Sequence, residues 1–190
     1  MRLTEPPQVS TSFHSPYSAG MKTFLGLLVV GGVAHADPKV PPEVTDLVKL
    51  VSGSWKCTGT AAIGADPAAQ PMTATLKTKA DLDGFWIHDT FDAKVGKTKL
   101  KYEAFTTYDS RKWRRVLVDN RGAQVIGTSD GVKEGKMDWN LDALASAGPA
   151  VQLRDHLDAS DPKAGLKLAG EQSSDKGKTW TKVYEMTCKK

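Results

Sequence analysis

The chain has 190 residues, of which 39% are hydrophobic and 25% are charged, and its 26 basic and 22 acidic residues give a formal net charge of +4. The length is that of one ordinary domain, and the composition excludes a disordered, collagen-like or low-complexity protein. The small excess of positive charge, without a long block of like charge, argues for solubility and against nucleic acid as a partner.

The N-terminal region predicts a signal peptide at residues 21–36. Lys22 supplies a short positive region, residues 24–33 form an apolar run, and the Ala-His-Ala triplet at 34–36 is a small-x-small cleavage site. The apolar run is about half as long as a membrane span. We therefore expect export, to the periplasm or out of the cell, with no membrane span after cleavage.

Residues 1–20 precede this signal and contain three prolines without apolar periodicity. A signal peptide sits at the start of a chain, so we interpret Met21 as the initiator and residues 1–20 as an upstream artefact or an unusual leader. Cleavage leaves residues 37–190 as a single domain, which is long enough to bury a core without help.

A short amphipathic helix is predicted at the start of this domain. It begins at the Pro-Pro pair 41–42 and ends near Gly53, and Val44, Leu47 and Val51 recur at helical spacing. Proline is tolerated in the first turn of a helix because the N–H that it lacks has no partner there.

After this helix, apolar and polar residues alternate with period two, which predicts strands. Residues 72–80 are the clearest case, with Met72, Ala74 and Leu76 on one face and threonines and lysines on the other. About ten such segments follow one another, at residues 55–63, 72–80, 85–91, 99–108, 112–119, 123–128, 136–144, 150–157, 165–171 and 179–188.

The short turns between these segments favour an all-β, up-and-down antiparallel arrangement, because a parallel sheet would need crossover helices for which there is no room. A meander of about ten strands conceals its edges best by closing into a barrel. The predicted fold class is therefore a closed antiparallel up-and-down barrel of about ten strands with a short N-terminal helix. An open two-sheet β-sandwich is the alternative.

Two stretches resemble a bacterial calycin-like (lipocalin-like) β-barrel domain family of unknown function. Gly-Ser-Trp at 53–55 follows the predicted helix and matches the Gly-x-Trp that begins the first strand of calycin barrels. Thr-Tyr-Asp at 107–109 stands where this family has a Gly-Tyr-Asp turn, and Leu-Val-Asp at 117–119 stands where it has Trp-x-Asp, with Gly122 at the expected spacing. The resemblance covers residues 48–186 and implies a fold, not an activity.

Cys57 and Cys188 are the two cysteines of the sequence. In an exported protein a pair of thiols is expected to be bonded. The first and last predicted strands carry one cysteine each, and these strands are neighbours in a closed meander, which brings the two side chains within bonding reach. We therefore predict a disulfide. A redox or metal-binding pair is the alternative, but it lacks a Cys-x-x-Cys motif and two further metal ligands.

No constellation of residues indicates a catalytic or metal site. Residues 127–131 match the Gly-x-Ser-x-Gly elbow of serine hydrolases, but Gly135 would interrupt the helix that must follow, so we interpret this segment as a hairpin turn. Asp89 and Asp92 are separated by an odd number of positions and fall on opposite faces of a strand, which makes them a poor acid and base pair.

Two histidines remain after signal cleavage, His88 and His156, and we expect them on the strand faces opposite to the core, with ligand contact as the alternative. The last predicted strand has no histidine of the kind that binds haem in some related small barrels, so no cofactor is expected. The run at residues 111–115 is basic with a tryptophan among the charges. Strand alternation divides it between two faces, so we expect a solvated strand edge rather than a nucleic-acid site.

The leading functional hypothesis is a barrel that binds or shields a small, partly apolar molecule, because barrels of about eight to ten strands tend to leave an internal cavity. The resemblance implies that Trp55 closes the barrel floor. The residues expected to line a lumen are Phe85, Ile87, Leu100, Tyr102, Trp113, Val151, Leu153 and Tyr184. The alternative is an envelope interaction or accessory module with a filled barrel and an exposed apolar patch. An enzyme is the third and least supported hypothesis, and the oligomeric state stays open.

Overall fold

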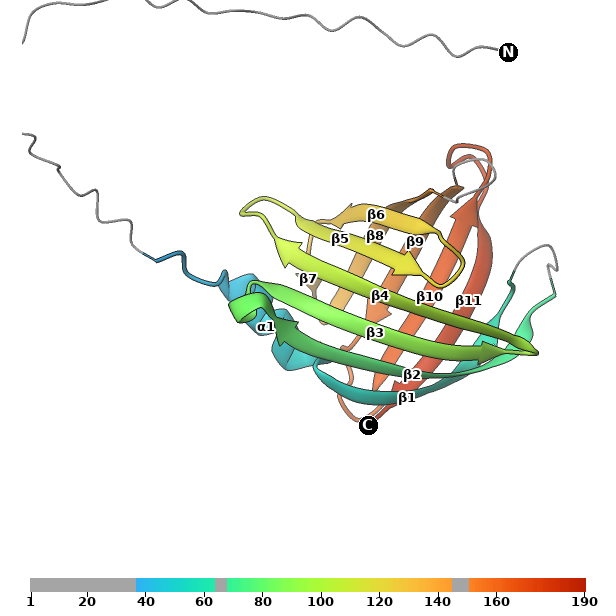
Figure 1. The fold of residues 1–190 in the computed structure, drawn as a ribbon, viewed down its shortest axis with the longest axis horizontal. Helices are drawn as coiled ribbons and strands as arrows, with labels where there is room; N and C mark the ends of the chain where they lie inside the picture. The colour runs from blue at the N-terminus through green and yellow to red at the C-terminus, as the bar shows by residue number, and fades with distance from the viewer. Residues whose placement is uncertain (1–36, 64–67, 145–150) are drawn as a thin grey trace, which may run out of the picture. The chain divides into compact units, whose positions relative to one another are not determined.

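Figure 1 shows the fold as a computed structural model, in which residues 37–63, 68–144 and 151–190 are described. The leader at residues 1–20 and the signal peptide at residues 21–36 are predictions that lie outside the described residues. Among the described residues, no helix is both long enough and apolar enough to cross a membrane.

The described part of the chain contains one α-helix, one short 3-10 helix and eleven strands, connected in the order of the sequence. They are α1 (Pro42–Val51), β1 (Gly53–Ala61), β2 (Gln70–Asp81), η1 (Leu82–Gly84), β3 (Trp86–Val95), β4 (Thr98–Tyr108), β5 (Trp113–Asp119), β6 (Gln124–Ser129), β7 (Val132–Lys133), β8 (Lys136–Leu144), β9 (Val151–Asp158), β10 (Leu166–Ser173) and β11 (Thr181–Lys189).

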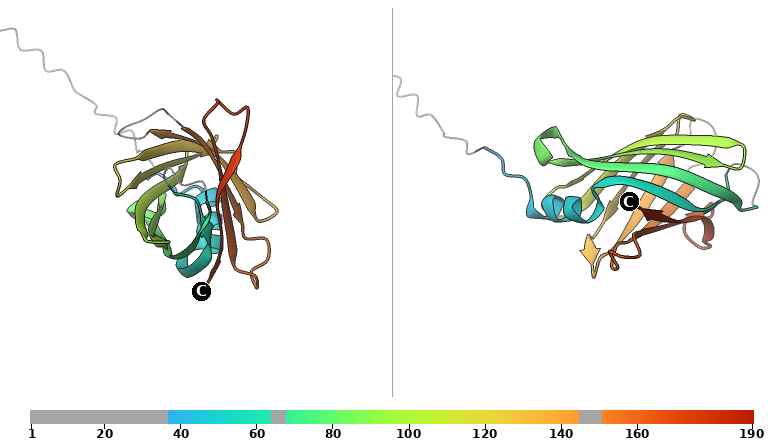
Figure 2. Two further views of the ribbon diagram at one scale, coloured as in Figure 1. Left: turned by 90° about the vertical axis from the view of Figure 1, so that its right-hand side faces the viewer. Right: turned by 90° about the horizontal axis from the view of Figure 1, so that it is seen from below.

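The strands form one antiparallel sheet that closes on itself. Each strand pairs with the next along the chain, except that β6 pairs with β8 instead of β7, and β1 pairs with β11, so ten strands make a ring (Figures 1 and 2). The two-residue strand β7 pairs only with the start of β8, at residues 132–133 and 136–137. The predicted closed barrel with a short N-terminal helix is confirmed, and the open sandwich is wrong because the hydrogen-bonded ring leaves no break between two sheets.

Helix α1 lies against one end of the barrel (Figure 2). It begins with proline in its first turn, and its buried side chains are Val44, Leu47 and Val51, which recur at helical spacing and so form one apolar face. Trp55, at the start of β1, is buried and its indole Nε1 donates to the carbonyl of Val51 at 2.8 Å. This bond satisfies a carbonyl of the last helical turn and ties the helix to the first strand.

The barrel interior contains two apolar clusters. The first surrounds Trp55, Phe91 and Met186, and the second packs α1 against Trp113 and Trp139. Both are built from alternate residues of the strands, because successive side chains of a strand point to opposite faces of the sheet. A layer of inward-facing polar side chains lies between these two clusters.

The predicted disulfide between Cys57 and Cys188 is confirmed, with an S–S distance of 2.03 Å. The two residues are direct partners in the pairing of β1 with β11, and both side chains are buried in the first apolar cluster. The covalent bond therefore joins the first strand of the barrel to the last.

The prediction of a hairpin turn at residues 127–131 is wrong for residues 127–129, which are the end of strand β6; only residues 130–131 connect β6 to β7. Ser129 is buried, and its hydroxyl accepts a hydrogen bond from the backbone N–H of Gly131 at 3.1 Å. Gly131 has a φ of +106°, which glycine adopts without steric cost. No helix follows, so the serine lacks the strand-to-helix elbow that exposes a hydrolase nucleophile.

Candidate functional site

A layer of polar side chains crosses the barrel between the two apolar clusters. Its charged members are Asp89 on β3, Arg115 on β5 and Asp155 on β9, and all three contribute to the lining of one internal cavity. Each occupies an inward position because it has the same strand parity as the core residues around it. In β3, for example, Asp89 lies between the buried residues Ile87 and Phe91.

The guanidinium of Arg115 is the centre of this layer. Its Nε donates to the hydroxyl of Thr106 at 3.1 Å, and its Nη2 lies 3.5 Å from a carboxylate oxygen of Asp89. The guanidinium carbon lies 4.5 Å from the ring centroid of Trp139, a distance typical of a cation–π contact. Its Nη1 lies 4.0 Å from the nearest oxygen of Asp155, which is too far for a direct hydrogen bond.

Asp89 is held firmly in this layer. Only 8% of its surface is exposed, and one carboxylate oxygen accepts a hydrogen bond of 2.7 Å from the hydroxyl of Thr78, its cross-strand neighbour on β2. The other oxygen faces Arg115. Asp89 and Arg115 therefore form an ion pair, and Thr78 adds a hydrogen bond to the carboxylate. Buried charges require such partners.

Asp155 is the less satisfied of the two carboxylates. Burial raises the pKa of its carboxyl, against the lowering effects of the Arg115 charge, of a hydrogen bond with Tyr184 and of His156. About a quarter of its side chain (23%) is accessible, as is 22% of that of Arg115. Both residues line the cavity.

Two tyrosines complete the polar lining. Burial raises the pKa of Tyr184 well above its usual value, and the nearby Asp155 charge adds to this. Burial also raises the pKa of Tyr102, as does the charge of Asp89. Both phenols therefore stay neutral at physiological pH and can donate a hydrogen bond. The ring of Tyr184 lies over Gly170, where a Cβ atom would come within 2.1 Å of it.

The cavity itself measures about 70 Å³. Its polar lining is that described above together with His156, and its apolar walls include Leu76, Met137, Leu157, Leu166, Leu168 and Met186, with Leu47 and Val51 from α1. The volume is well below the roughly 300–1,000 Å³ of a site for a drug-sized ligand, but it is enough for several water molecules or a small organic group.

The fold and this cavity are the features on which a functional assignment has to rest. No model of a protein family matches this chain, and no curated protein sequence matches it. The assignment is therefore made from the geometry of the lumen.

The residues expected to line a lumen divide into three groups. Ile87, Tyr102 and Tyr184 line the cavity. Leu100 packs against the first apolar cluster, whereas Trp113 and Leu153 belong to the second or pack against it. Phe85 and Val151 are half-buried and belong neither to the cavity lining nor to the two clusters, because Phe85 lies in the turn after η1 and Val151 is the first residue of β9. Contact of any of them with a ligand stays a prediction.

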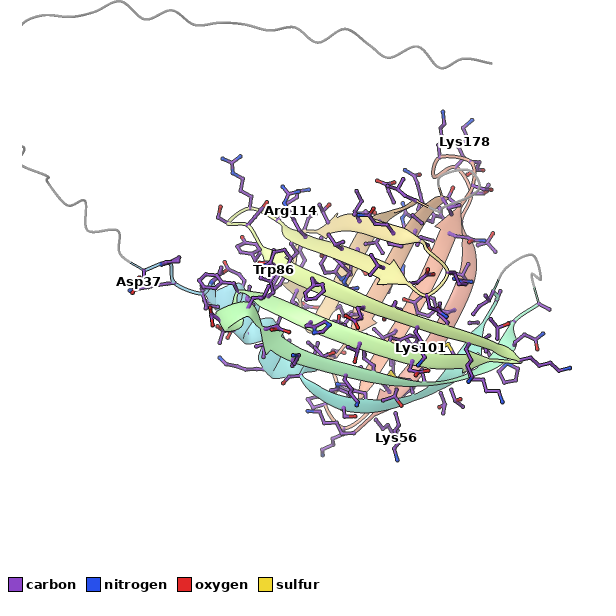
Figure 3. The ribbon with its side chains drawn as sticks, viewed as in Figure 1. Asp37, Lys56, Trp86, Lys101, Arg114 and Lys178 are labelled. Carbon is purple, nitrogen blue, oxygen red and sulfur yellow. A yellow bond between two sulfur atoms is a disulfide. The ribbon has the colours of Figure 1, made fainter. Side chains whose placement is uncertain are left out.

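Sequence reasoning missed the three charged residues of the lumen. The interpretation of residues 111–115 as a solvated strand edge is wrong for Trp113, which is buried, and for Arg115, which points inward. It holds for Arg114, which lies on the outer surface and pairs with Asp109 (Figure 3). The signal that could have found them is a charged residue with the parity of an apolar strand face, as for Asp155 between Leu153 and Leu157.

Both histidines make their side-chain contacts outside this layer, although His156 also contributes to the lining of the cavity. His88 is on the outer face of β3, where its ring stacks on Phe105 at 4.5 Å and its nitrogens contact Asp81 and Glu103. His156 is half exposed and its Nδ1 lies 2.7 Å from a carboxylate oxygen of Asp138. Both histidines are therefore engaged in outer-face contacts rather than in the polar layer around Arg115.

Proposed function

We propose that this protein binds a small molecule inside its barrel, in the cavity between Arg115 and Asp155. The observation that carries the proposal is the distance of 4.0 Å between Nη1 of Arg115 and the nearest carboxylate oxygen of Asp155. Both residues line the same cavity. A polar gap of this size is commonly bridged by water or by a polar group of a ligand.

The energetics of burial favour a functional role for this gap. Placing charged groups inside a protein is costly, and the cost is recovered only when the charges are in good contact and their hydrogen-bonding capacity is used. Asp89 meets this condition through Thr78 and Arg115. Asp155 does not meet it with Arg115, so donors and acceptors remain available to a third group in the cavity.

The walls of the cavity indicate the shape of such a ligand. A polar end would lie between Arg115 and Asp155, and a short apolar body would contact Met137, Leu157 and Leu168. With a volume of about 70 Å³, the ligand has only a few non-hydrogen atoms. The proposal thus keeps the partly apolar ligand expected from the sequence and adds a polar anchor to it.

We further propose that the protein works in the periplasm or outside the cell. The disulfide between Cys57 and Cys188 supports this, because structural disulfides persist in oxidising compartments. The signal peptide predicted at residues 21–36 agrees with it.

Ligand-observed NMR on the purified protein tests lumen binding. A collection of small molecules with no more than about six non-hydrogen atoms is screened against the wild type, Arg115→Met and Arg114→Met. We expect the same bound molecules for the wild type and for Arg114→Met, which removes a charge from the outer face of the same strand, and altered affinities for Arg115→Met, which removes a charge from the cavity lining.

A measurement on the wild type tests lumen binding even if Arg115→Met fails to fold. Bound molecules should show intermolecular NOEs to the ring protons of Tyr102 and Tyr184, which line the cavity. A screen without any bound molecule, or bound molecules without these NOEs, would reject lumen binding.

The second candidate function is interaction through the outer surface, and one observation favours it. Four exposed apolar side chains gather on the outer face of β5, β6 and β8, and Val116 and Ile126 among them are direct cross-strand partners; the four are Val116, Val118, Ile126 and Leu144. Patches of this kind often mark protein contacts. The test is to compare cross-linked envelope partners of the wild type with those of a Val118→Lys, Ile126→Lys variant, which should lose them and keep lumen binding.

A further inference from the structure

We propose that the polar end of the lumen ligand is a cation, a protonated amine held by the carboxylate of Asp155. This inference rests on the proposed binding of a small molecule in the cavity and adds the chemical class of its head group. It follows from the balance of charges inside the barrel and from how the contacts of each charged group are used.

The cavity has more acidic than basic groups. On the described strands, the carboxylates and the guanidinium that line it are Asp89, Asp155 and Arg115, so one positive charge faces two negative charges. His156 also contributes to the lining, but its ring nitrogens contact Asp138 and Glu171. The neighbouring phenols of Tyr102 and Tyr184 are neutral. With both carboxylates ionised, the formal charge of the lining is −1, and one carboxylate lacks a counter-charge.

The contacts identify Asp155 as that carboxylate. The guanidinium of Arg115 is directed to Thr106 and to Asp89 at 3.1 and 3.5 Å, and its face covers Trp139. Asp155 lies 4.0 Å from the guanidinium, and Tyr184 is its hydrogen-bonded neighbour. A carboxylate can accept about four hydrogen bonds, of which the bond with Tyr184 uses one.

An ammonium group matches these acceptor sites. It offers three N–H donors, supplies the missing positive charge, and forms charge-assisted hydrogen bonds that are roughly twice as strong as neutral ones. A ligand carboxylate would approach Arg115, which is already paired with Asp89, and would meet like charge from Asp155. The raised pKa of Asp155 agrees with a carboxyl that lacks a cation in the unliganded barrel.

Three ligands with the same three-carbon body test the head group on the purified wild type: propylammonium, 1-propanol and propionate. Dissociation constants are measured by NMR titration at one pH and low salt. We expect propylammonium to bind at least about tenfold more tightly than the other two, the effect of one additional charge-assisted hydrogen bond.

Two variants test whether Asp155 is responsible for the tighter binding of propylammonium. Asp155→Asn keeps the size of the side chain and removes its charge, and we expect it to weaken propylammonium binding about tenfold while leaving 1-propanol unchanged. Asp92→Asn is the matched control, because this carboxylate lies exposed on the outer face of the same barrel and pairs with Lys101 at 2.8 Å. This variant should leave the dissociation constants of all three ligands unchanged.

The outcomes separate this inference from the function on which it rests. If propionate or 1-propanol binds in the lumen as tightly as propylammonium, the assignment of a cationic head group is wrong, and the proposal of small-molecule binding stands. If propylammonium binds equally well to Asp155→Asn, the assignment to Asp155 is wrong. If all three ligands fail to bind and the fragment screen is also empty, the proposed function itself fails.

Discussion

Replacing Cys57 and Cys188 by alanine should remove a large share of the stability of the barrel. The two cysteines are 131 residues apart in the sequence, so their bond closes most of the domain into one loop. The entropy that a cross-link removes from the unfolded chain grows with the logarithm of loop length, and a loop of this length corresponds to about 5 kcal/mol at 25 °C. Folded domains are stable by roughly 5–15 kcal/mol, so the loss would be a third or more of the total.

The assay is equilibrium unfolding in urea, followed by the fluorescence of the five tryptophans. The double variant is compared with the wild type, each with and without dithiothreitol. We expect the reduced wild type to lose about as much stability as the variant does, and the variant to be indifferent to the reductant. A loss below about 1 kcal/mol in both arms would refute the loop-closure reasoning.

Three further outcomes follow from the polar layer. Arg115→Met should lower the free energy of unfolding by about 3–5 kcal/mol, because it leaves the buried carboxylate of Asp89 without its counter-charge, whereas Arg114→Met on the outer face should change it by less than about 1 kcal/mol; urea unfolding measures both. Burial raises the folded-state pKa of Asp155 above its unfolded value, so its contribution is present at low pH and is lost as the pH rises through the folded pKa. The stability of Asp155→Asn relative to the wild type should therefore increase with pH over that range and then level off, as a series of urea midpoints would show. Gly170→Ala should destabilise the barrel by about 1–3 kcal/mol in thermal melts, because its methyl group would overlap the ring of Tyr184.

Strand alternation predicted the architecture well because it reports a local property. In residues 72–80 the structure buries Met72 and Leu76, as alternation predicts, whereas β5 and β6 also carry apolar side chains on the outer face, at Val116, Val118 and Ile126. The helix was predicted equally well, since Val44, Leu47 and Val51 form its buried face. The two-residue strand β7 was missed, because a segment of that length has no period to detect.

The polar layer depends on distances that no local pattern contains. Arg115 on β5 and Asp155 on β9 are brought within 4.0 Å by the curvature of a closed ring. Asp89 was compared only with Asp92 on its own strand, whereas its partners are Thr78 on the preceding strand and Arg115 two strands further along the ring. Parity could have marked each charge as inward, but it could not have shown which charges meet.

The order of strand pairing also determines when the disulfide can form. Every pairing of the described ring joins consecutive strands, or strands separated only by the short β7, apart from that between β1 and β11. Hairpins between consecutive strands close quickly, whereas contacts between distant segments form late because the loop entropy must be overcome first. The thiols of Cys57 and Cys188 therefore meet only when the ring closes, and both are then buried. Oxidation of this pair therefore occurs in molecules whose barrel has closed. The rate at which the two thiols become unreactive toward a labelling reagent measures barrel closure directly.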